Sequence, residues 1–142
     1  MKKTVRLLND ICKNTEMGTD GVKMMQRYCK HPSMHAALAH QLDEYDEIYT
    51  QASDLLAQYG KSPKKIPAAG KIATHLATTA KAWHGLSTSK IAEMMINGNT
   101  MGVIQITRSA RKCKGCDDQA ATLAETLAQT EERNVDDMKR FL

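Results

Sequence analysis

Apolar residues recur three or four positions apart along most of this chain, and that spacing constrains its fold more than any other feature. It predicts amphipathic helices, because residues three and four apart lie on one face of a helix. Strand-like alternation is missing from the sequence, and aromatic residues, which strands favour, make up only 4%. The sequence therefore predicts an all-α protein.

Helix-breaking and capping residues divide this pattern into five segments. His31 precedes Pro32 and therefore avoids the helical conformation, and Gly60 is typical of a helix end. Ser87 and Asp117 are typical of helix starts. We expect helices at residues 4–30, 33–59, 68–86, 90–112 and 117–141, within a single domain of 142 residues.

The lengths of these segments indicate how they are connected. Four of them are about 35–42 Å long at 1.5 Å per residue, and the helix expected at 68–86 is shorter. Two long helices, a connection able to travel the length of a bundle and two more long helices are typical of a ferritin-like four-helix bundle. We therefore predict such a bundle, with a long crossover containing an additional short helix. A plain up-and-down bundle is the alternative.

Composition and charge exclude several classes of protein. Charged residues at 25% beside hydrophobic residues at 42% exclude a disordered chain. No apolar run approaches about 18 residues, and the basic start is not followed by an apolar stretch, so we expect neither membrane insertion nor a signal peptide, and a cytoplasmic location. The net charge of +4 is split into blocks: residues 33–60 carry acids and no bases, and residues 61–90 carry lysines and no acids. Such blocks favour contacts between helices over nucleic-acid binding.

Polar residues interrupt the apolar faces near the middle of the long helices. At 100° per residue, four of them fall at or close to the centre of a face: Gln41, Asn99, Glu131 and Asn134. Glu16 and Glu44 fall on the edges of their faces. We predict that these residues form one buried polar layer across the bundle, which Gly98 and Gly102 assist by allowing close approach of their helix.

Three segments resemble small bacterial ferritin-like proteins of unknown function, and the resemblance covers most of the chain. They are the opening Leu8-Asn-Asp-Ile-Cys12 with Glu16-x-Gly18, the tryptophan-containing stretch 68–86, and Asn97-Gly98-Asn99. Ferritin-like bundles of the di-iron class hold metal with one Glu from each of two helices and Glu-x-x-His from each of the other two. The resemblance therefore implies a metal centre at mid-bundle.

Only part of that ligand pattern is present in this chain. Glu16 matches the first glutamate, and Gln41-x-x-Glu44 stands where a Glu-x-x-His is expected. Asn99 replaces a glutamate, and Glu131-x-x-Asn134 has lost its histidine. The preferred hypothesis is a hydrogen-bonded layer with no cofactor. The alternative is iron or manganese held by Glu16, Glu44 and Glu131.

Cys113-Lys-Gly-Cys116 is the second candidate site. It lies among basic residues just before a helix start, and both features lower the pKa of a thiol. Cys113 and Cys116 are therefore a candidate redox pair or half of a zinc site, although incidental thiols explain the motif as well. Cys29 and His31 are the obvious further zinc ligands, but only a plain up-and-down bundle would bring them to Cys113 and Cys116, because a long crossover places the two turns at opposite ends. Cys12 and Cys29 read as small apolar residues.

The sequence contains no catalytic triad, phosphate-binding loop or nucleotide motif, so an enzymatic role would rest on the resemblance alone. We expect a non-catalytic binding, structural or stress-related protein with a degenerate metal site. The alternatives are a metal-binding ferritin-like protein and a thiol redox or zinc-linked module. Homo-oligomerisation through helix faces is left open, and no protein partner is indicated.

Overall fold

The computed structural model describes residues 1–65 and 86–142. It contains four long helices: α1 (Lys2–Tyr28), α2 (Pro32–Gln58), α4 (Thr88–Arg111) and α5 (Asp118–Lys139). Their ends lie within two residues of the expected ones, and the described residues contain no strand. The helix expected at 68–86 lies outside the described residues.

Local side-chain chemistry explains where the helices begin and end. The His31 imidazole accepts a hydrogen bond from the Met34 amide ahead of α2, and Ser87 Oγ accepts from the Lys90 amide ahead of α4. Asp117 does the same for α5 through the Gln119 amide at 2.9 Å. After α2, Gly60 adopts a φ of +69°, which favours glycine and stops the helix.

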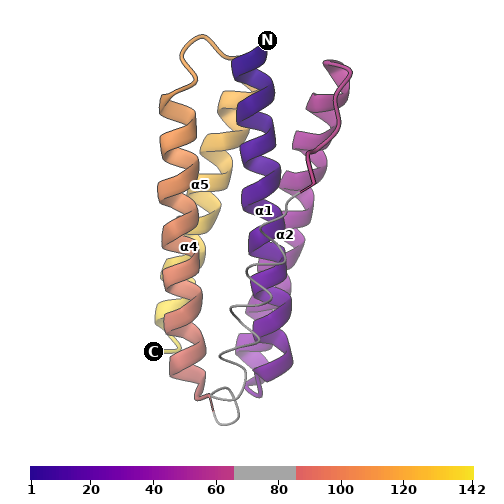
Figure 1. Ribbon diagram of the computed structural model, residues 1–142. Helices are drawn as coiled ribbons and strands as arrows, with labels where there is room; N and C mark the ends of the chain where they lie inside the picture. Colours follow the sequence, from indigo (N-terminus) through magenta and orange to yellow (C-terminus); the bar gives the residue numbers. More distant parts are fainter. Residues whose placement is uncertain (66–85) are drawn as a thin grey trace.

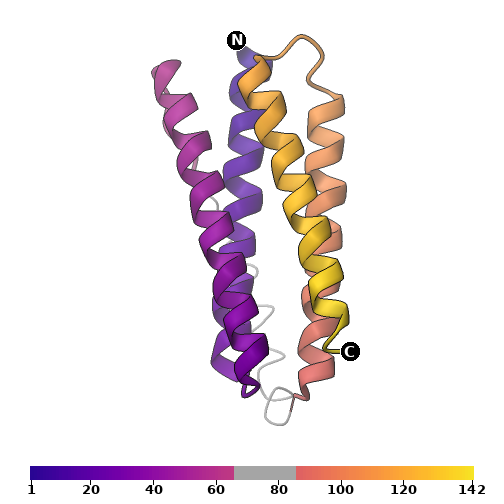
Figure 2. The same cartoon turned by 180° about the vertical axis from the view of Figure 1, so that it is seen from behind.

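The four helices form two antiparallel hairpins that pack side by side. α1 pairs with α2 and α4 with α5, while α1 also contacts α4 and α2 contacts α5 (Figures 1 and 2). In Figure 1, α1 runs downward and α2 upward, after which α4 again runs upward and α5 downward. Because α2 and α4 run in the same direction, α2 ends and α4 begins at opposite ends of the bundle, about 36 Å apart for a 24-residue helix. This is the predicted arrangement with a long crossover.

The two short turns lie at opposite ends of the bundle. The turn between α4 and α5 lies against the start of α1, where the Asp117 amide donates to Thr4 Oγ1 at 3.1 Å. The turn between α1 and α2 lies beside the C-terminus, where the rings of His31 and Phe141 are 5.5 Å apart.

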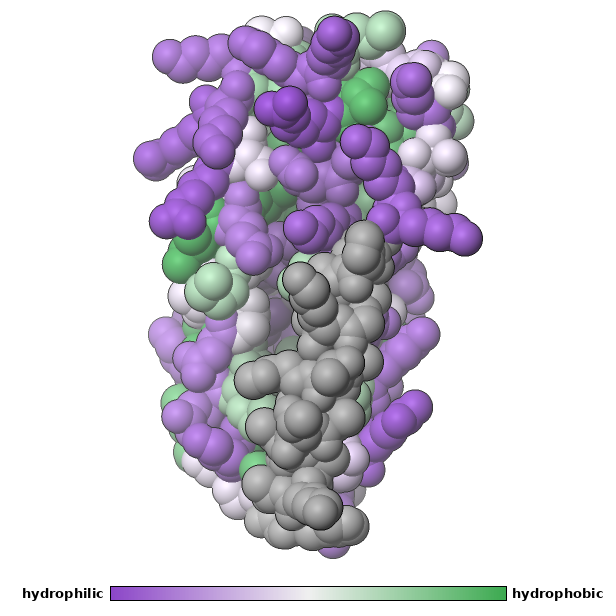
Figure 3. Space-filling model, in the orientation of Figure 1, coloured by the Kyte–Doolittle hydropathy of each residue, from purple (hydrophilic) through white to green (hydrophobic). Residues whose placement is uncertain are grey.

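Aliphatic side chains from all four helices fill the interior. The largest fully buried ones are Leu7, Leu8, Ile11, Met34, Leu38, Leu56, Ile91, Ile106, Leu127 and Met138, together with Tyr45. Hydrophilic residues make up most of the described part of the face shown in Figure 3, and apolar residues appear between them in small patches. The polar side chains buried within this core are therefore the feature that calls for a functional explanation.

Candidate functional site

Tyr45 lies at the centre of the buried polar layer and connects three helices. Its hydroxyl on α2 is 3.0 Å from Asn99 Oδ1 on α4 and 2.9 Å from Glu131 Oε1 on α5. All three residues are at most 2% exposed. A buried tyrosine hydroxyl needs polar partners, and here both partners come from the other hairpin of the bundle.

Two glycines make room for this cluster. A Cβ atom on Gly18 of α1 would lie 2.5 Å from Cζ of the Tyr45 ring, and one on Gly102 of α4 would overlap the Glu131 carboxyl group. Gly102 also accepts a hydrogen bond through its carbonyl oxygen from Asn14 Nδ2 at 3.0 Å. Gly102 thus permits the close approach that the sequence predicted for α4.

Glu131 is held mainly in its protonated form at neutral pH. Burial raises the pKa of this carboxyl to about 8, although hydrogen bonds from Tyr45 and Asn14 act in the opposite direction. The Tyr45 hydroxyl faces both Glu131 Oε1 and Asn99 Oδ1, and its single proton is donated to one of these two oxygens at a time.

Several buried atoms of the layer have no hydrogen-bond partner within the described part of the chain. Beside Tyr45 they are Asn14 Oδ1, Asn99 Nδ2 and Glu131 Oε2. On α2 and α5 they are both amide atoms of Gln41, Glu44 Oε1 and Asn134 Nδ2. Buried polar groups without partners are costly, so these atoms indicate places where water or a ligand completes the layer.

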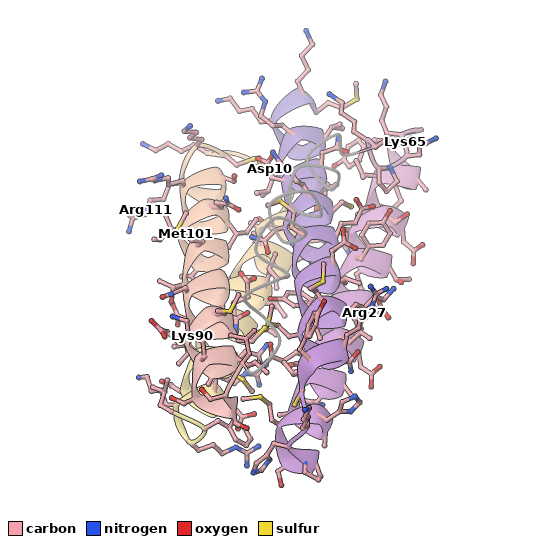
Figure 4. The ribbon with its side chains drawn as sticks, turned by 60° about the horizontal axis from the view of Figure 1, so that its bottom comes forward. Asp10, Arg27, Lys65, Lys90, Met101 and Arg111 are labelled. Carbon is pink, nitrogen blue, oxygen red and sulfur yellow. A yellow bond between two sulfur atoms is a disulfide. The ribbon has the colours of Figure 1, made fainter. Side chains whose placement is uncertain are left out.

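A pocket of about 250 Å³ opens onto this layer between α1 and α4. Asn14, Tyr45, Asn99 and Glu131 form its polar end. Among the described residues, its other walls are five methionines, Val22, Gln105 and four glycines: Met17, Met25, Met94, Met95 and Met101, with Gly18, Gly21, Gly98 and Gly102. Met101 lies midway along α4, between Lys90 and Arg111 (Figure 4), and is 54% exposed, so the pocket reaches the surface beside it.

The structure places the four residues predicted at the centre of the layer, Gln41, Asn99, Glu131 and Asn134, in the interior, each at most 4% exposed. Asn99 and Glu131 meet at Tyr45, whereas Gln41 and Asn134 lie on α2 and α5. Sequence reasoning missed Tyr45 and Asn14. The 3.6-residue period places Tyr45 on the apolar stripe of its helix, and the need of a buried tyrosine hydroxyl for a polar partner is the signal that could identify it.

The three carboxylates considered as metal ligands face different neighbours. Glu16 interacts with Tyr49 and Cys12 on the side of α1 that faces α2, and contributes to raising the pKa of both. Glu44 lies 3.5 Å from Arg133 and 3.8 Å from His40, and Glu131 is bound to Tyr45. Among residues 1–65 and 86–142, no three His, Cys, Asp or Glu side chains are grouped so that they could hold a metal ion.

The cysteines occupy three separate environments. Cys113 and Cys116 are joined as a disulfide at the turn before α5, and their role as a redox pair stays a prediction. Cys29 is half-buried at the opposite end of the bundle, near His31. Within one chain, Cys29 and His31 therefore cannot complete a zinc site with Cys113 and Cys116. This separation is the one expected for a bundle with a long crossover.

Alkylation should distinguish these environments. Burial and the nearby Glu16 carboxylate raise the pKa of the Cys12 thiol to about 12 from 9.0, which lowers its thiolate fraction roughly a thousandfold. Brief iodoacetamide treatment of the native protein at pH 8, followed by peptide mass mapping, is expected to label Cys29 and, only after mild reduction, Cys113 and Cys116. Labelling of Cys12 as fast as Cys29 would contradict the buried position of Cys12.

Comparison with known proteins supports the fold assignment. Sequence comparison matches the chain to no family model and to no curated protein. In structure, it is similar to a dodecameric thioferritin, the bacterioferritin-related protein from Bacteroides fragilis, with a TM-score of 0.75 at 10% identity over 99% of this chain and 84% of that one. The chain has a ferritin-like fold. No helix in the described residues is both long and apolar enough to cross a membrane.

Proposed function

We propose that this ferritin-like bundle is a non-catalytic binding protein whose mid-bundle layer is built for hydrogen bonding rather than for metal. The observation that carries the proposal is the Tyr45 hydroxyl, which lies between Asn99 Oδ1 and Glu131 Oε1. The ligands of a di-metal centre in this fold come from the same mid-helix level, where this chain has a buried phenol and neutral amides.

The residues present do not fit a pair of iron or manganese ions. Hard divalent cations need several anionic oxygens, and imidazoles strengthen such sites in ferritin-like bundles. Here the layer offers the amides of Gln41, Asn99 and Asn134, and the one fully buried carboxyl is mainly protonated at neutral pH. Glu44, the next carboxyl on α2, is engaged by Arg133 and His40. Charge and geometry therefore both argue against two bound cations.

A binding role is supported by the pocket beside the layer. It combines an apolar body with a short polar end, the combination typical of small-molecule sites, and it lies between the two hairpins. Adaptable methionine side chains on both α1 and α4 form much of its wall.

Thermal-shift measurements test the absence of a metal function. We expect no saturable rise in Tm with manganese, or with iron(II) under anaerobic conditions, whereas a site occupied at 100 times its Kd would add about 2.7 kcal/mol and several degrees. A saturable rise that Glu131→Gln abolishes and the exposed control Glu132→Gln retains would overturn the proposal and favour a site made by Glu16, Glu44 and Glu131. In protein whose Cys113–Cys116 disulfide has been reduced, a rise with zinc alone that survives Glu131→Gln would instead support the zinc-linked alternative through these cysteines.

A further inference from the structure

The turn between α4 and α5 carries a disulfide at the surface of the bundle. Cys113 and Cys116, which form it, are both half-buried, and Lys112, Lys114 and Gly115 around them are exposed. The turn lies beside the N-terminus at one end of the bundle (Figure 1). A small reactant therefore reaches the two sulfur atoms without any unfolding of the protein.

Backbone interactions hold this turn in shape independently of the sulfur–sulfur bond. The Cys116 amide donates to the Cys113 carbonyl oxygen at 3.3 Å, and Gly115, the third residue of the turn, has a φ of +79°, as a type II turn requires. The Asp117 amide donates to Thr4 Oγ1, which fixes the turn to α1. A disulfide that closes so short a loop also restricts the unfolded chain little. We therefore expect the turn to persist after reduction and to keep the two thiols next to each other.

The two sulfur atoms have different surroundings. Cys113 Sγ lies 3.2 Å from the carbonyl oxygen of Lys3 and packs against the hydrophobic core. Once the disulfide is reduced, this oxygen accepts a hydrogen bond from the Cys113 thiol, which favours the protonated form. Cys116 directly precedes Asp117, the capping residue of α5, and so lies at the positive end of that helix, which favours a thiolate. Cys116 is therefore the better attacking group.

Positive charges outnumber negative charges around the turn. Arg111, Lys112 and Lys114 are exposed, and none of them forms an ion pair within the described part of the chain. The lysines that begin α1 lie beside them. The acids of the segment are Asp117 and Asp118, of which Asp117 is engaged in capping α5. Such an excess of positive charge stabilises a thiolate and attracts a negatively charged reactant.

We propose that Cys113 and Cys116 form a reversible thiol–disulfide exchange site for small, negatively charged disulfides, in which Cys116 attacks and Cys113 resolves. The site lies at one end of the bundle and uses no residue of the mid-bundle layer. It is therefore independent of the binding function proposed above and goes beyond it.

The exchange proceeds in two steps. In the reduced protein, the Cys116 thiolate attacks one sulfur of the disulfide, a bond forms between that sulfur and Cys116 Sγ, and the other half leaves as a thiolate. Cys113 then loses its proton, attacks Cys116 Sγ and releases the second half as a thiolate. The two cysteines give up two electrons, which reduce the disulfide, and their two protons pass through solvent to the two product thiols. A dithiol reductant reverses the sequence and restores the reduced protein.

Mass spectrometry of the alkylated native protein tests whether the disulfide exchanges. Dithiothreitol is expected to open the bond between Cys113 and Cys116 within minutes in the absence of denaturant, and to leave the far-ultraviolet circular dichroism unchanged. Glutathione disulfide should then restore the intramolecular bond, with no glutathione retained on either cysteine. A bond that opens only in urea, or a reoxidised protein that keeps glutathione on Cys116, would overturn the proposal.

Two single substitutions identify the attacking cysteine. Reduced Cys113→Ser lacks the resolving thiol, so glutathione disulfide is expected to leave a stable mixed disulfide on Cys116. Reduced Cys116→Ser keeps Cys113 alone, and we expect its thiol to react at least about tenfold more slowly. Peptide mapping separates both from Cys12 and Cys29. Equal rates, or a faster reaction of Cys113, would overturn the assignment of the two roles.

Charge reversal tests the preference for negatively charged disulfides in the Cys113→Ser background. Glutathione disulfide is anionic and cystamine is cationic, so the ratio of their rates reports charge, whereas a change in the amount of thiolate alters both rates alike. Lys114→Glu is expected to lower this ratio about fivefold or more at low ionic strength. Lys23→Glu, an exposed control towards the other end of α1, should leave it unchanged. An unchanged ratio in Lys114→Glu would overturn the charge preference.

Discussion

The free energy of unfolding is expected to fall as the pH rises from 4.5 to 8, by up to about 5 kcal/mol through Glu131 alone. Burial raises the pKa of this carboxyl from 4.5 to about 8 in the folded protein. Between these values the folded chain holds a proton that the unfolded chain has released, so each pH unit lowers stability by about 1.4 kcal/mol. The contribution is complete below pH 4.5, is lost progressively up to pH 8 and is constant above it.

Urea unfolding of three proteins between pH 5 and pH 9 checks this expectation. Glu131→Gln places a neutral amide in the same position, so it removes the proton linkage and can still form hydrogen bonds in the layer. We expect this variant to lie within about 1–2 kcal/mol of the native protein at pH 5 and to become the more stable of the two, by several kcal/mol, at pH 9.

Glu132→Gln is the matched control, because Glu132 is the exposed neighbour of Glu131 on α5. Its stability is expected to follow that of the native protein across the whole pH range. Parallel curves for native protein and Glu131→Gln would show that the Glu131 carboxyl has an ordinary pKa. The argument for a neutral layer at mid-bundle would then fail.

The helices and their order were predictable because their signals are local. Pro32, Gly60, Ser87 and Asp117 act on backbone conformation within a few residues, and the structure places helix boundaries at each of them. The long crossover was predictable from the lengths of the segments. If α2 and α4 run in the same direction, the connection between them has to be as long as the bundle. The fold is thus encoded in short-range patterns.

The inward direction of Asn99 and Glu131 was also predictable, because a period of 3.6 residues fixes which face of a helix a residue occupies. The contacts that they make were not. Periodicity places Tyr45 on the same apolar stripe as Leu38 and Ile48, and nothing in the sequence of α2 shows that its hydroxyl reaches residues on α4 and α5. Such partners depend on helix rotation and on rotamers, which are set by packing across the bundle.

The same dependence on packing explains why the three carboxylates considered as metal ligands do not meet. Glu16, Glu44 and Glu131 all lie at mid-helix, yet each faces a different neighbour, because a shift of one residue along a helix turns a side chain by 100°.

The pocket was not predictable for a further reason. Its volume is what remains after side chains of many sizes have packed, and four glycines along α1 and α4 leave it unfilled.

Gly18→Ala is expected to destabilise the protein by about 1–3 kcal/mol, although alanine favours helices more than glycine does by about 1 kcal/mol. The new methyl group would lie 2.5–2.9 Å from three carbons of the Tyr45 ring, which is too rigid and too well enclosed to move aside. Displacing the ring also breaks the contacts of its hydroxyl with Asn99 and Glu131, so the loss of stability should be accompanied by a change in the near-ultraviolet circular dichroism of the tyrosines.

Gly21→Ala provides the comparison on the same helix, because a Cβ atom there meets nothing within 4 Å among the residues that the structure describes. We expect it to stabilise the protein by about 0.5–1 kcal/mol through helix propensity. Urea unfolding of both variants should therefore give shifts of opposite sign. Gly98→Ala and Gly102→Ala repeat the test on α4, where only Gly102 faces the Glu131 carboxyl. If all four variants were stabilised alike, Tyr45 would not lie against Gly18 and Glu131 would not lie against Gly102. The positions of Tyr45 and Glu131 in the hydrogen-bonded layer would then be contradicted.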